Sequence, residues 1–262
     1  AMGLGNVYTF GPTFRAENSQ TTRHLSEFWM MEPEMSFADL DYTMGFVEMY
    51  LKFVLTELQK ICPKELEYLD KYMQEEEKGL KKEDRSMPLL EKLQSVCGEP
   101  FKRITYTEAF DILRASKPAK KGKFEFPVEK WGMDLQSEHE RYLVEKHFKC
   151  PVIVHDYPKE LKAFYMRDNE DGKTVAAMDV LFPGIGEIVG GSQREERLDV
   201  LKEKMTTFGI SHEEMSWFLD TRRFGTAPHS GFGVGFERLV QFATGMKNIR
   251  DVVLYPRSPG SL

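Results

Sequence analysis

The stretch from Phe14 to Glu34 carries side chains that could act on a small charged ligand. Its pattern predicts two strands joined by a polar loop. Arg15 and Glu17 lie two positions apart and would share one face of the first strand. The matching face of the second strand would carry Phe28, Met30, Glu32 and Glu34. An arginine, an aromatic ring and several carboxylates are unusual on a core-facing side of a sheet, and they suit a ligand with an anionic part, a flat ring and an amine.

A charged hairpin of this kind also has a purely structural interpretation. Its charges can be solvated, with incidental ion pairs that add little to stability. The loop from Asn18 to Ser26 is rich in hydroxyl, amide and cationic side chains and fits either interpretation. Other parts of the chain are needed to choose between them.

A glycine-rich stretch lies near the other end of the chain. Gly231, Gly233 and Gly235 alternate in a predicted strand, 230–235, that leads into a predicted helix, 236–244. Glycine weakens a strand interior, so this spacing favours close approach of the backbone to a nucleotide lying on the sheet. A GxGxG pattern is weak evidence alone, because dinucleotide-binding folds also use it, although the GxxG helix arrangement and the βαβ context are missing here.

The elements that must position these residues indicate an α+β fold. Apolar residues recur at three- and four-residue steps over 39–60, which predicts a core helix. Strand candidates at 152–155, 163–167 and 174–182 follow one another closely, which favours antiparallel pairing over alternating βαβ units. We therefore expect an antiparallel sheet of about six strands with helices against one face. A helical insertion is expected at about residues 60–150, much of it charged and solvated.

The segment around Gly190 and Gly191 is predicted to turn. Ser192 and Glu195 have the spacing of a capping box, so a helix would begin just behind that turn. Arg194 would then lie in the first turn of this helix.

Composition limits the class of protein. The 262 residues suffice for one domain with an insertion. A formal charge of −6 does not suggest a nonspecific nucleic-acid binder. Cys62, Cys97 and Cys150 form no CxxC pair, which suggests a reducing compartment and no structural zinc. No apolar run approaches membrane-spanning length and no signal peptide is evident, so we expect a cytoplasmic protein without a membrane partner.

Three motifs point to one family. FRAENSQTTRHLSEF (14–28) resembles motif 2 of the class II aminoacyl-tRNA synthetases, and GFGVGFERL (231–239) resembles motif 3 of that class. Between them, DVLFPGIGEIVGGSQREERL (179–198) resembles the amino-acid-binding segment of the asparaginyl branch. The resemblance covers essentially the whole chain and implies a class II synthetase-like antiparallel sheet flanked by helices.

The resemblance implies a reaction in which the carboxylate of asparagine attacks the α-phosphate of ATP and releases pyrophosphate. Since the substrate is itself the nucleophile, the protein must supply alignment and charge neutralisation. Arg15 at the α-phosphate and Arg238 near the γ-phosphate and adenine are implied as the catalytic residues, because a guanidinium has a permanent charge and a planar fork of donors.

Further ATP-binding residues follow from the same resemblance. Phe28 would stack on adenine, Glu17 would accept from its amino group, and His24 would reach the outer phosphates. The remaining members of the implied set are Arg23, Leu25, Glu187, Gly233, Gly235, Phe236 and Glu237.

The implied amino-acid-binding residues are Glu32, Gly190 and Arg194. Arg194 would contact the substrate side chain, and Glu32 would hold the α-amine or the amide. The aspartyl relatives also use an arginine at the position of Arg194. The preference for asparagine therefore comes mainly from the particular residues of the motifs quoted above. A carboxylate near the amide NH2 would favour asparagine and repel aspartate.

A magnesium site is implied at Asp179 and Glu187, which flank a tight Pro-Gly segment. Mg²⁺ takes oxygen ligands and bridges phosphates. Without the family resemblance, two unrelated surface carboxylates would be the simpler interpretation.

The implied second step transfers the acyl group to the terminal adenosine of a tRNA. Arg23 and the basic segment 117–123 are candidates for phosphate contacts at the acceptor end. The family's anticodon-binding β-barrel and its motif 1 are not found in this sequence. We therefore expect the C-terminal catalytic part of a longer enzyme, which would be a homodimer at full length.

Two other functions stay open. A synthetase-like asparagine synthetase would amidate aspartate through an aspartyl adenylate; the missing barrel favours it, whereas the helical insertion and the missing motif 1 do not. A non-catalytic synthetase-like module would bind a partner or RNA. The intact set Arg15, Glu17, Glu187, Arg194 and Arg238 argues against that module.

Overall fold

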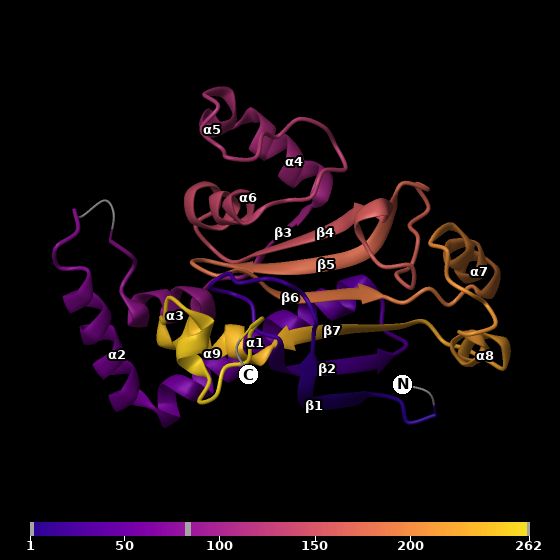
Figure 1. The fold of residues 1–262 in the computed structure, drawn as a ribbon, viewed down its shortest axis with the longest axis horizontal. Coiled ribbons are helices and arrows are strands. Elements are labelled where there is room, and N and C mark those ends of the chain that lie inside the picture. The colour runs from indigo at the N-terminus through magenta and orange to yellow at the C-terminus, as the bar shows by residue number, and fades with distance from the viewer. Residues whose placement is uncertain (1–2, 82–84, 261–262) are drawn as a thin grey trace. The chain divides into compact units, whose positions relative to one another are not determined.

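The computed structural model describes residues 3–81 and 85–260 of the chain. Its strands form a seven-stranded sheet in the order β1-β2-β7-β6-β5-β4-β3 (Figure 1). These strands are β1 (Val7–Phe14), β2 (Glu27–Ser36), β3 (Lys102–Thr105), β4 (Val152–Pro158), β5 (Thr174–Phe182), β6 (Gly186–Gln193) and β7 (His229–Gly235). With helices flanking this sheet, the α+β class expected from the sequence is confirmed.

The sheet contains both antiparallel and parallel pairs. β5 pairs antiparallel with β4 and with β6, as the closely spaced strand candidates predict. β3 instead pairs parallel with β4, with Lys102 opposite Val152. The long connection between them contains helices, and a crossover of that length returns the chain in its original direction. The predicted helical insertion at 60–150 therefore includes one strand of the sheet.

The helices are α1 (Leu40–Ile61), α2 (Pro63–Glu76), α3 (Leu89–Gly98), α4 (Tyr106–Ala115), α5 (Lys117–Lys120), α6 (Ser137–Arg141), α7 (Leu198–Thr207), α8 (Ser216–Arg223) and α9 (Phe236–Thr244). Shorter helical turns are η2 (Tyr142–His147), η3 (Lys159–Leu161) and η4 (Ile249–Val252). The core helix predicted at 39–60 is confirmed as α1. The glycine-rich strand and the helix after it are confirmed as β7 and α9, which ends at Gly245 in the left-handed conformation.

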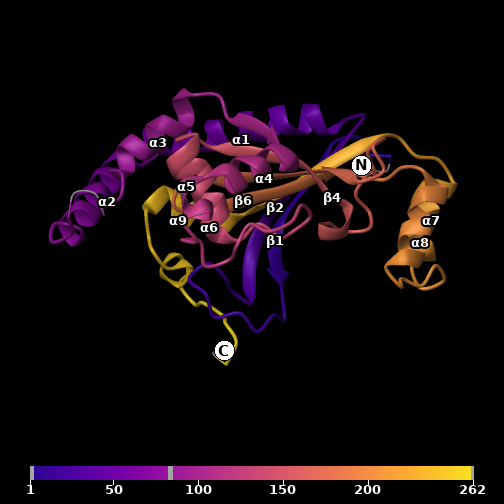
Figure 2. The same cartoon turned by 90° about the horizontal axis from the view of Figure 1, so that it is seen from above.

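The chain divides into two compact units, and the first comprises Ala1–Thr9, Glu32–Phe46 and Lys102–Gly233. Its core is built on β4 and β5, whose residues are almost all buried. A continuous apolar run such as that of β5 is typical of a strand covered on both faces. Within this unit, α4 packs on β4 and α6 packs on β5 and β6 (Figure 1). α7 and α8 pair with each other around a smaller apolar cluster (Figure 2).

The second unit comprises Phe10–Met31, Val47–Phe101 and Val234–Leu262. Here α2 lies beside α3, and α3 contacts α9. α2 buries only Leu66, which agrees with the solvated character predicted for this charged region. α3 has a buried apolar stripe, made of Leu89, Leu93 and Val96.

The predicted hairpin at 14–34 differs in its first half. β2 is the predicted second strand and carries the expected alternation of side chains. β1, however, ends at Phe14, and residues 15–26 form an irregular loop. The N–H of Arg15 donates to the carbonyl of Ser26 at 2.9 Å, which joins the two ends of the loop. The prediction that Arg15 and Glu17 share a strand face is therefore wrong.

The turn predicted at Gly190 and Gly191 is also wrong, because β6 runs straight through both. A Cβ at Gly191 would lie 2.7 Å from the Cβ of Phe232, so this glycine allows close packing inside the sheet. No helix begins at Ser192, and α7 starts only at Leu198. Arg194 lies outside any helix, in an isolated antiparallel bridge with Met166 that replaces the strand predicted at 163–167.

Candidate active site

The second unit gathers the arginines that the sequence places at a triphosphate. Arg15 and Arg23 of the loop and Arg238 of α9 all act electrostatically on the imidazole of His24. Burial lowers the pKa of His24 most, followed by repulsion from Arg238 and then from Arg23. Glu17 opposes this effect and Arg15 adds to it. Side chains from distant parts of the chain thus create one positive region around a neutral imidazole.

An aromatic ring lies in the same region. The guanidinium carbon of Arg15 is 5.3 Å from the ring centroid of Phe28, a cation–π distance. Phe28 is half-buried on β2, so its ring can offer a flat surface. A hydrogen bond of 2.5 Å between Thr21 Oγ1 and His24 Nδ1 orients the imidazole.

The loop that holds these residues is tied to the C-terminal part of the chain. The N–H of Ser26 donates to the carbonyl of Arg257 at 2.8 Å, and the N–H of Ile249 donates to the carbonyl of Thr22 at 2.9 Å. These bonds give an irregular segment a defined path, which a set of convergent arginines requires.

Glu237 has a positioning role in the structure. It is buried, and the N–H of Trp29 donates to both of its carboxylate oxygens, at 3.0 and 2.9 Å. Burial raises the pKa of Glu237. This carboxylate joins the first turn of α9 to β2. Its neighbour Phe236 is exposed and packs edge-on against Phe10, with the ring centroids 5.4 Å apart.

The other nucleotide-side candidates are placed as follows. Leu25 is buried, whereas Glu17 is exposed in the loop. Gly233 and Gly235 both lie on β7. A Cβ at Gly235 would lie 3.8 Å from the Arg238 side chain, so this glycine leaves ordinary contact space.

The first unit contains a second charged cluster, centred on Arg194. Its Nε and Nη2 donate to the two carboxylate oxygens of Glu34 at 2.7 and 3.0 Å, forming a bidentate ion pair. Its Nη1 donates to Ser192 Oγ at 2.6 Å. The guanidinium carbon lies 5.4 Å from the ring centroid of Tyr165. Arg194 is thus held in a fixed plane by partners from three segments.

Gly231 makes room for this ion pair. A Cβ at position 231 would collide with the Glu34 carboxylate and lie 2.7 Å from Arg194 Nη2. The sequence predicts a nucleotide as the reason for glycine on β7. At Gly231 the structure gives a different reason, because a side chain there would displace the ion pair of Glu34 with Arg194.

The carboxylates of β2 are divided in their contacts. Glu32 is exposed and accepts a hydrogen bond of 3.3 Å from Thr9 Oγ1. Glu34, two residues on, is the partner of Arg194. Of these two, Glu34 is the residue that sequence reasoning left out of the site.

The carboxylates predicted to hold Mg²⁺ converge over Gly190. A Cβ there would lie 3.1 Å from Glu187 Oε1 and 3.6 Å from Asp179 Oδ1, so the absence of a side chain leaves space between them. Lys162 Nζ donates to Asp179 Oδ2 at 2.6 Å. Nothing in residues 3–81 and 85–260 forms a group of three or more potential metal-binding side chains. Two carboxylate ligands fit Mg²⁺, which usually completes its shell with waters and phosphate oxygens.

Three further residues belong to the Arg194 cluster, and sequence reasoning did not assign them. Ser192 and Tyr165 contact Arg194 directly. His229 accepts from the N–H of Arg194 through its carbonyl, and burial lowers the pKa of its imidazole. Alternation along β2 could have identified Glu34. No sequence signal identifies Tyr165, because its place depends on the bridge between Met166 and Arg194.

The described part of the chain has no helix that is both long and apolar enough to cross a membrane.

Comparison with known proteins gives a consistent result. The chain is 58% identical over 261 residues to an asparagine–tRNA ligase of Cytophaga hutchinsonii, covering 100% of this chain and 53% of that protein. It is 58% identical over 260 residues to the corresponding ligase of Desulfotalea psychrophila, covering 99% of this chain and 54% of the relative. The chain therefore spans about half the length of the curated relatives it matches.

Solved structures show the same fold. Asparaginyl-tRNA synthetase from Pyrococcus horikoshii, complexed with asparaginyl-adenylate, matches with a TM-score of 0.84 at 38% identity, covering 100% of this chain and 54% of that one. An aspartyl-tRNA synthetase from Entamoeba histolytica matches with a TM-score of 0.79 at 27% identity, covering 100% and 49%. The profile of the family described as tRNA synthetases class II (D, K and N) matches residues 1–259. The chain therefore belongs to the class II tRNA synthetases of the D, K and N group.

Proposed function

We propose that this chain activates asparagine with ATP as the aminoacyl adenylate and transfers it to the 3′ end of its tRNA. The observation that carries this proposal is the gathering of Arg15, Arg23 and Arg238 around His24, beside the ring of Phe28. A region of fixed positive charge next to a stacking surface suits a purine triphosphate. The proposal takes residues 1–262 as one catalytic domain.

In the first step, the asparagine carboxylate attacks the α-phosphate and pyrophosphate leaves. Arg15 would neutralise charge at the α-phosphate, and Arg238 would hold the γ-phosphate near adenine. Phe28 would stack on adenine while Glu17 accepts from its amino group. His24, kept neutral by its surroundings, would donate a hydrogen bond to the outer phosphates. The nucleotide-lining remainder would be Arg23, Leu25, Gly233, Gly235, Phe236 and Glu237.

The first unit would bind the amino acid. Arg194, held by Glu34 and Ser192, would present its guanidinium to the substrate side chain. Its charge is balanced by Glu34, and this supports a neutral amide such as that of asparagine over a second carboxylate. Glu32 would hold polar parts of the substrate. The names of the relatives at 53–58% identity support the same amino acid.

Asp179 and Glu187 would hold Mg²⁺ beside Gly190, and Glu187 would also face the nucleotide. The ion would neutralise charge on the phosphates when bound. Lys162 already balances Asp179 electrostatically, so it would have to share that carboxylate with the ion.

Transfer to tRNA would follow at the terminal adenosine. Arg23 and the basic segment 117–123 would contact phosphates of the acceptor end. We further propose that the full-length protein is a homodimer in the cytoplasm.

Pyrophosphate exchange measured with each of twenty amino acids tests the first step. We expect ATP to incorporate labelled pyrophosphate with asparagine and not with aspartate. Exchange with aspartate alone would reject the proposal. If ammonia were then consumed and free asparagine appeared, aspartate amidation would replace it. Charging of tRNA by the protein at its full natural length tests the second step.

A further inference from the structure

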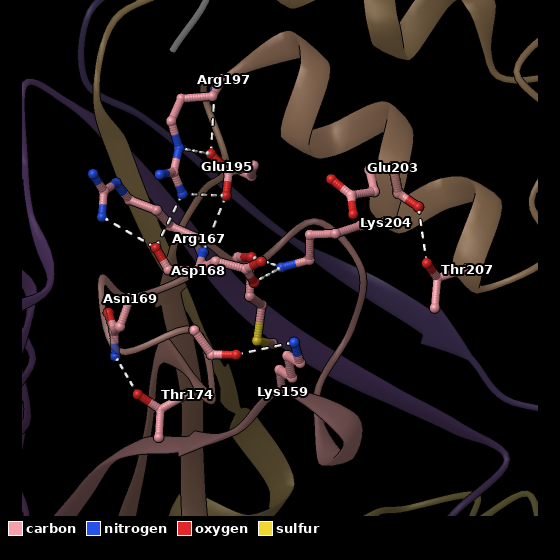
Figure 3. Close-up of polar contacts among 12 residues, drawn as sticks. Lys159, Arg167, Asp168, Asn169, Thr174, Glu195, Arg197, Glu203, Lys204 and Thr207 are labelled. Atoms are coloured by element: carbon pink, nitrogen blue, oxygen red, sulfur yellow. Dashed lines mark hydrogen bonds and ion pairs between the residues drawn. The ribbon is translucent and has the colours of Figure 1, made fainter.

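A second ionic network begins at the residue that follows Arg194 in the sequence, and its centre is the carboxylate of Glu195 (Figure 3). Glu195 is fully buried. Burying a carboxylate is costly unless charged and hydrogen-bonding partners compensate for lost hydration. A fully buried glutamate next to a binding residue therefore needs an explanation.

Its partners are well defined. Arg197 donates through Nε and Nη2 to the two carboxylate oxygens, at 2.7 and 2.8 Å. The backbone N–H of Asp168 donates to Oε2 at 3.0 Å. Burial acts to raise the pKa of Glu195, but the bonds from Arg197 and from the Asp168 amide lower it overall. The carboxylate is therefore ionised and joins residue 197 to the segment around residue 168.

The backbone of Glu195 is held as well. Its N–H donates to the carbonyl of Tyr165 at 2.8 Å, and its carbonyl accepts from Arg222 Nε at 3.0 Å. Arg222 is itself buried on α8. Backbone and side chain together attach Glu195 to the 165–168 segment at two points.

The 165–168 segment is where the ring that contacts Arg194 is attached. Tyr165 carries that ring, and Met166 forms the antiparallel bridge with Arg194. The far end of the segment is held by Lys204, whose Nζ donates to the carbonyl of Met166 and pairs with the Asp168 carboxylate (Figure 3). The segment forms only isolated bridges and a few backbone bonds, such as that from the N–H of Arg167 to the carbonyl of Gln193 at 3.0 Å, and the side-chain bonds of Glu195 and Lys204 add to these.

We propose that Glu195 is a positioning residue of the amino-acid site, which holds the Tyr165 ring and the Arg194 guanidinium in register with each other. The inference rests on the proposed function, because it assumes that Arg194 meets the substrate side chain. It assigns to Glu195 a role that the capping-box pattern in the sequence did not suggest. The ion pair with Arg197 acts on the substrate only through this alignment.

The test compares Glu195→Gln with Glu203→Gln in the protein at its full natural length. Glu203 is an exposed residue of α7 in the same region, so it controls for the loss of one carboxylate charge. We expect Glu195→Gln to raise the KM for asparagine in pyrophosphate exchange about ten-fold or more, because small misplacements of a binding group are costly. The KM for ATP should change less than about two-fold, a split that general loss of structure would not produce.

Hydrogen exchange supplies a readout that does not depend on activity. The amide of Asp168 should exchange faster in Glu195→Gln than in the wild type or in Glu203→Gln. An unchanged Asp168 amide would overturn the inference, as would an unchanged KM for asparagine in an active enzyme. A wild type without asparagine-dependent pyrophosphate exchange would instead overturn the proposed function. Hydrogen exchange of the Asp168 amide would still test whether Glu195 holds that segment. If Glu195→Gln does not fold, Arg197→Gln decides: the same shifts support the inference, and their absence overturns it.

Discussion

At the scale of single residues, the candidate site depends on how its charges are compensated. Arg194 is balanced by Glu34, whereas the arginines around His24 face an imidazole that stays neutral. A guanidinium paired with a carboxylate can recognise a neutral amide, and several arginines that act on one place attract phosphate. The same residue type therefore serves two purposes according to its neighbours.

Replacing Arg15 by glutamine should slow pyrophosphate exchange by about 10²–10³, as for the loss of one donor that stabilises developing charge. Arg15 is exposed, so the free energy of unfolding should change by less than about 0.5 kcal/mol. The rate of pyrophosphate exchange checks the first expectation, and chemical denaturation checks the free energy of unfolding. Arg114→Gln, an exposed arginine of α4, is the control and should leave both unchanged. Equal losses of rate in the two variants would contradict the role of Arg15.

His24 leads to a prediction on pH. Because burial and Arg238 lower its pKa below 6.5, protonation is less favourable in the folded chain than in the unfolded one. The folded state therefore loses stability as the pH falls below about 6.5 and on through the lower, folded-state pKa. In His24→Gln this part of the loss should vanish, which gives a shallower dependence of the denaturation midpoint on pH. An NMR titration that placed the His24 pKa at or above 6.5 would rule this out.

At the scale of elements, the glycines of β6 and β7 decide how closely side chains approach the sheet. Gly191 packs against Phe232, Gly231 accommodates the ion pair of Glu34 with Arg194, and Gly190 leaves space between two carboxylates. Each glycine thus answers a steric demand from a neighbouring side chain. These strands tolerate the lower strand propensity of glycine because the sheet buries them between other strands.

Gly231→Ala should disturb the amino-acid side selectively. The added methyl group must displace Glu34 or Arg194, so we expect the KM for asparagine to rise about ten-fold or more. Overpacking should also lower the free energy of unfolding by about 1–3 kcal/mol. Steady-state exchange kinetics and denaturation measure the two effects. Gly98→Ala at the end of α3, where an added Cβ meets nothing within 4 Å, is the matched control. Normal asparagine KM in Gly231→Ala would refute the steric argument.

At the scale of the whole molecule, the residues proposed to contact the two substrates fall in different compact units. Arg15, His24, Phe28 and Arg238 belong to the second unit, and Glu34, Asp179, Glu187 and Arg194 belong to the first. The net charge of −6 conceals this division, since the local field at His24 is positive. Net charge therefore says little about where phosphates bind.

This division predicts separable effects on the two substrates. Arg194→Gln should weaken the binding of asparagine, which is measured as a higher KM. The affinity for a non-hydrolysable ATP analogue should stay within about two-fold of the wild-type value. Arg238→Gln should instead weaken the binding of the ATP analogue by about ten-fold or more, because a charge-assisted phosphate contact is lost. The KM for asparagine should change little. Calorimetry with the analogue and initial rates of exchange separate the outcomes. Should each variant weaken both ligands equally, the assignment of substrates to units would be wrong.

Local pattern predicts several residues of the proposed site. Arg15, Phe28 and Arg238 lie in motifs whose residue types already indicate phosphate and ring recognition. The helix after β7 was predictable because Gly235 precedes an amphipathic stretch and Gly245 ends it. The strand placement of Arg15 failed because a polar loop can continue a strand pattern without forming ladder bonds. The turn predicted at Gly190 and Gly191 is wrong because glycine's use in close packing leaves no local signal.

Residue types and their spacing within short segments were enough to indicate the family, the α+β class and most charged groups of the candidate site. Tertiary structure alone decided that Glu34 rather than Glu32 pairs with Arg194, that Tyr165 reaches the same guanidinium, and that Glu195 is buried in a network instead of capping a helix. The physical reason is that these contacts join segments far apart in the chain. Their geometry depends on strand register and side-chain packing, which no local pattern records.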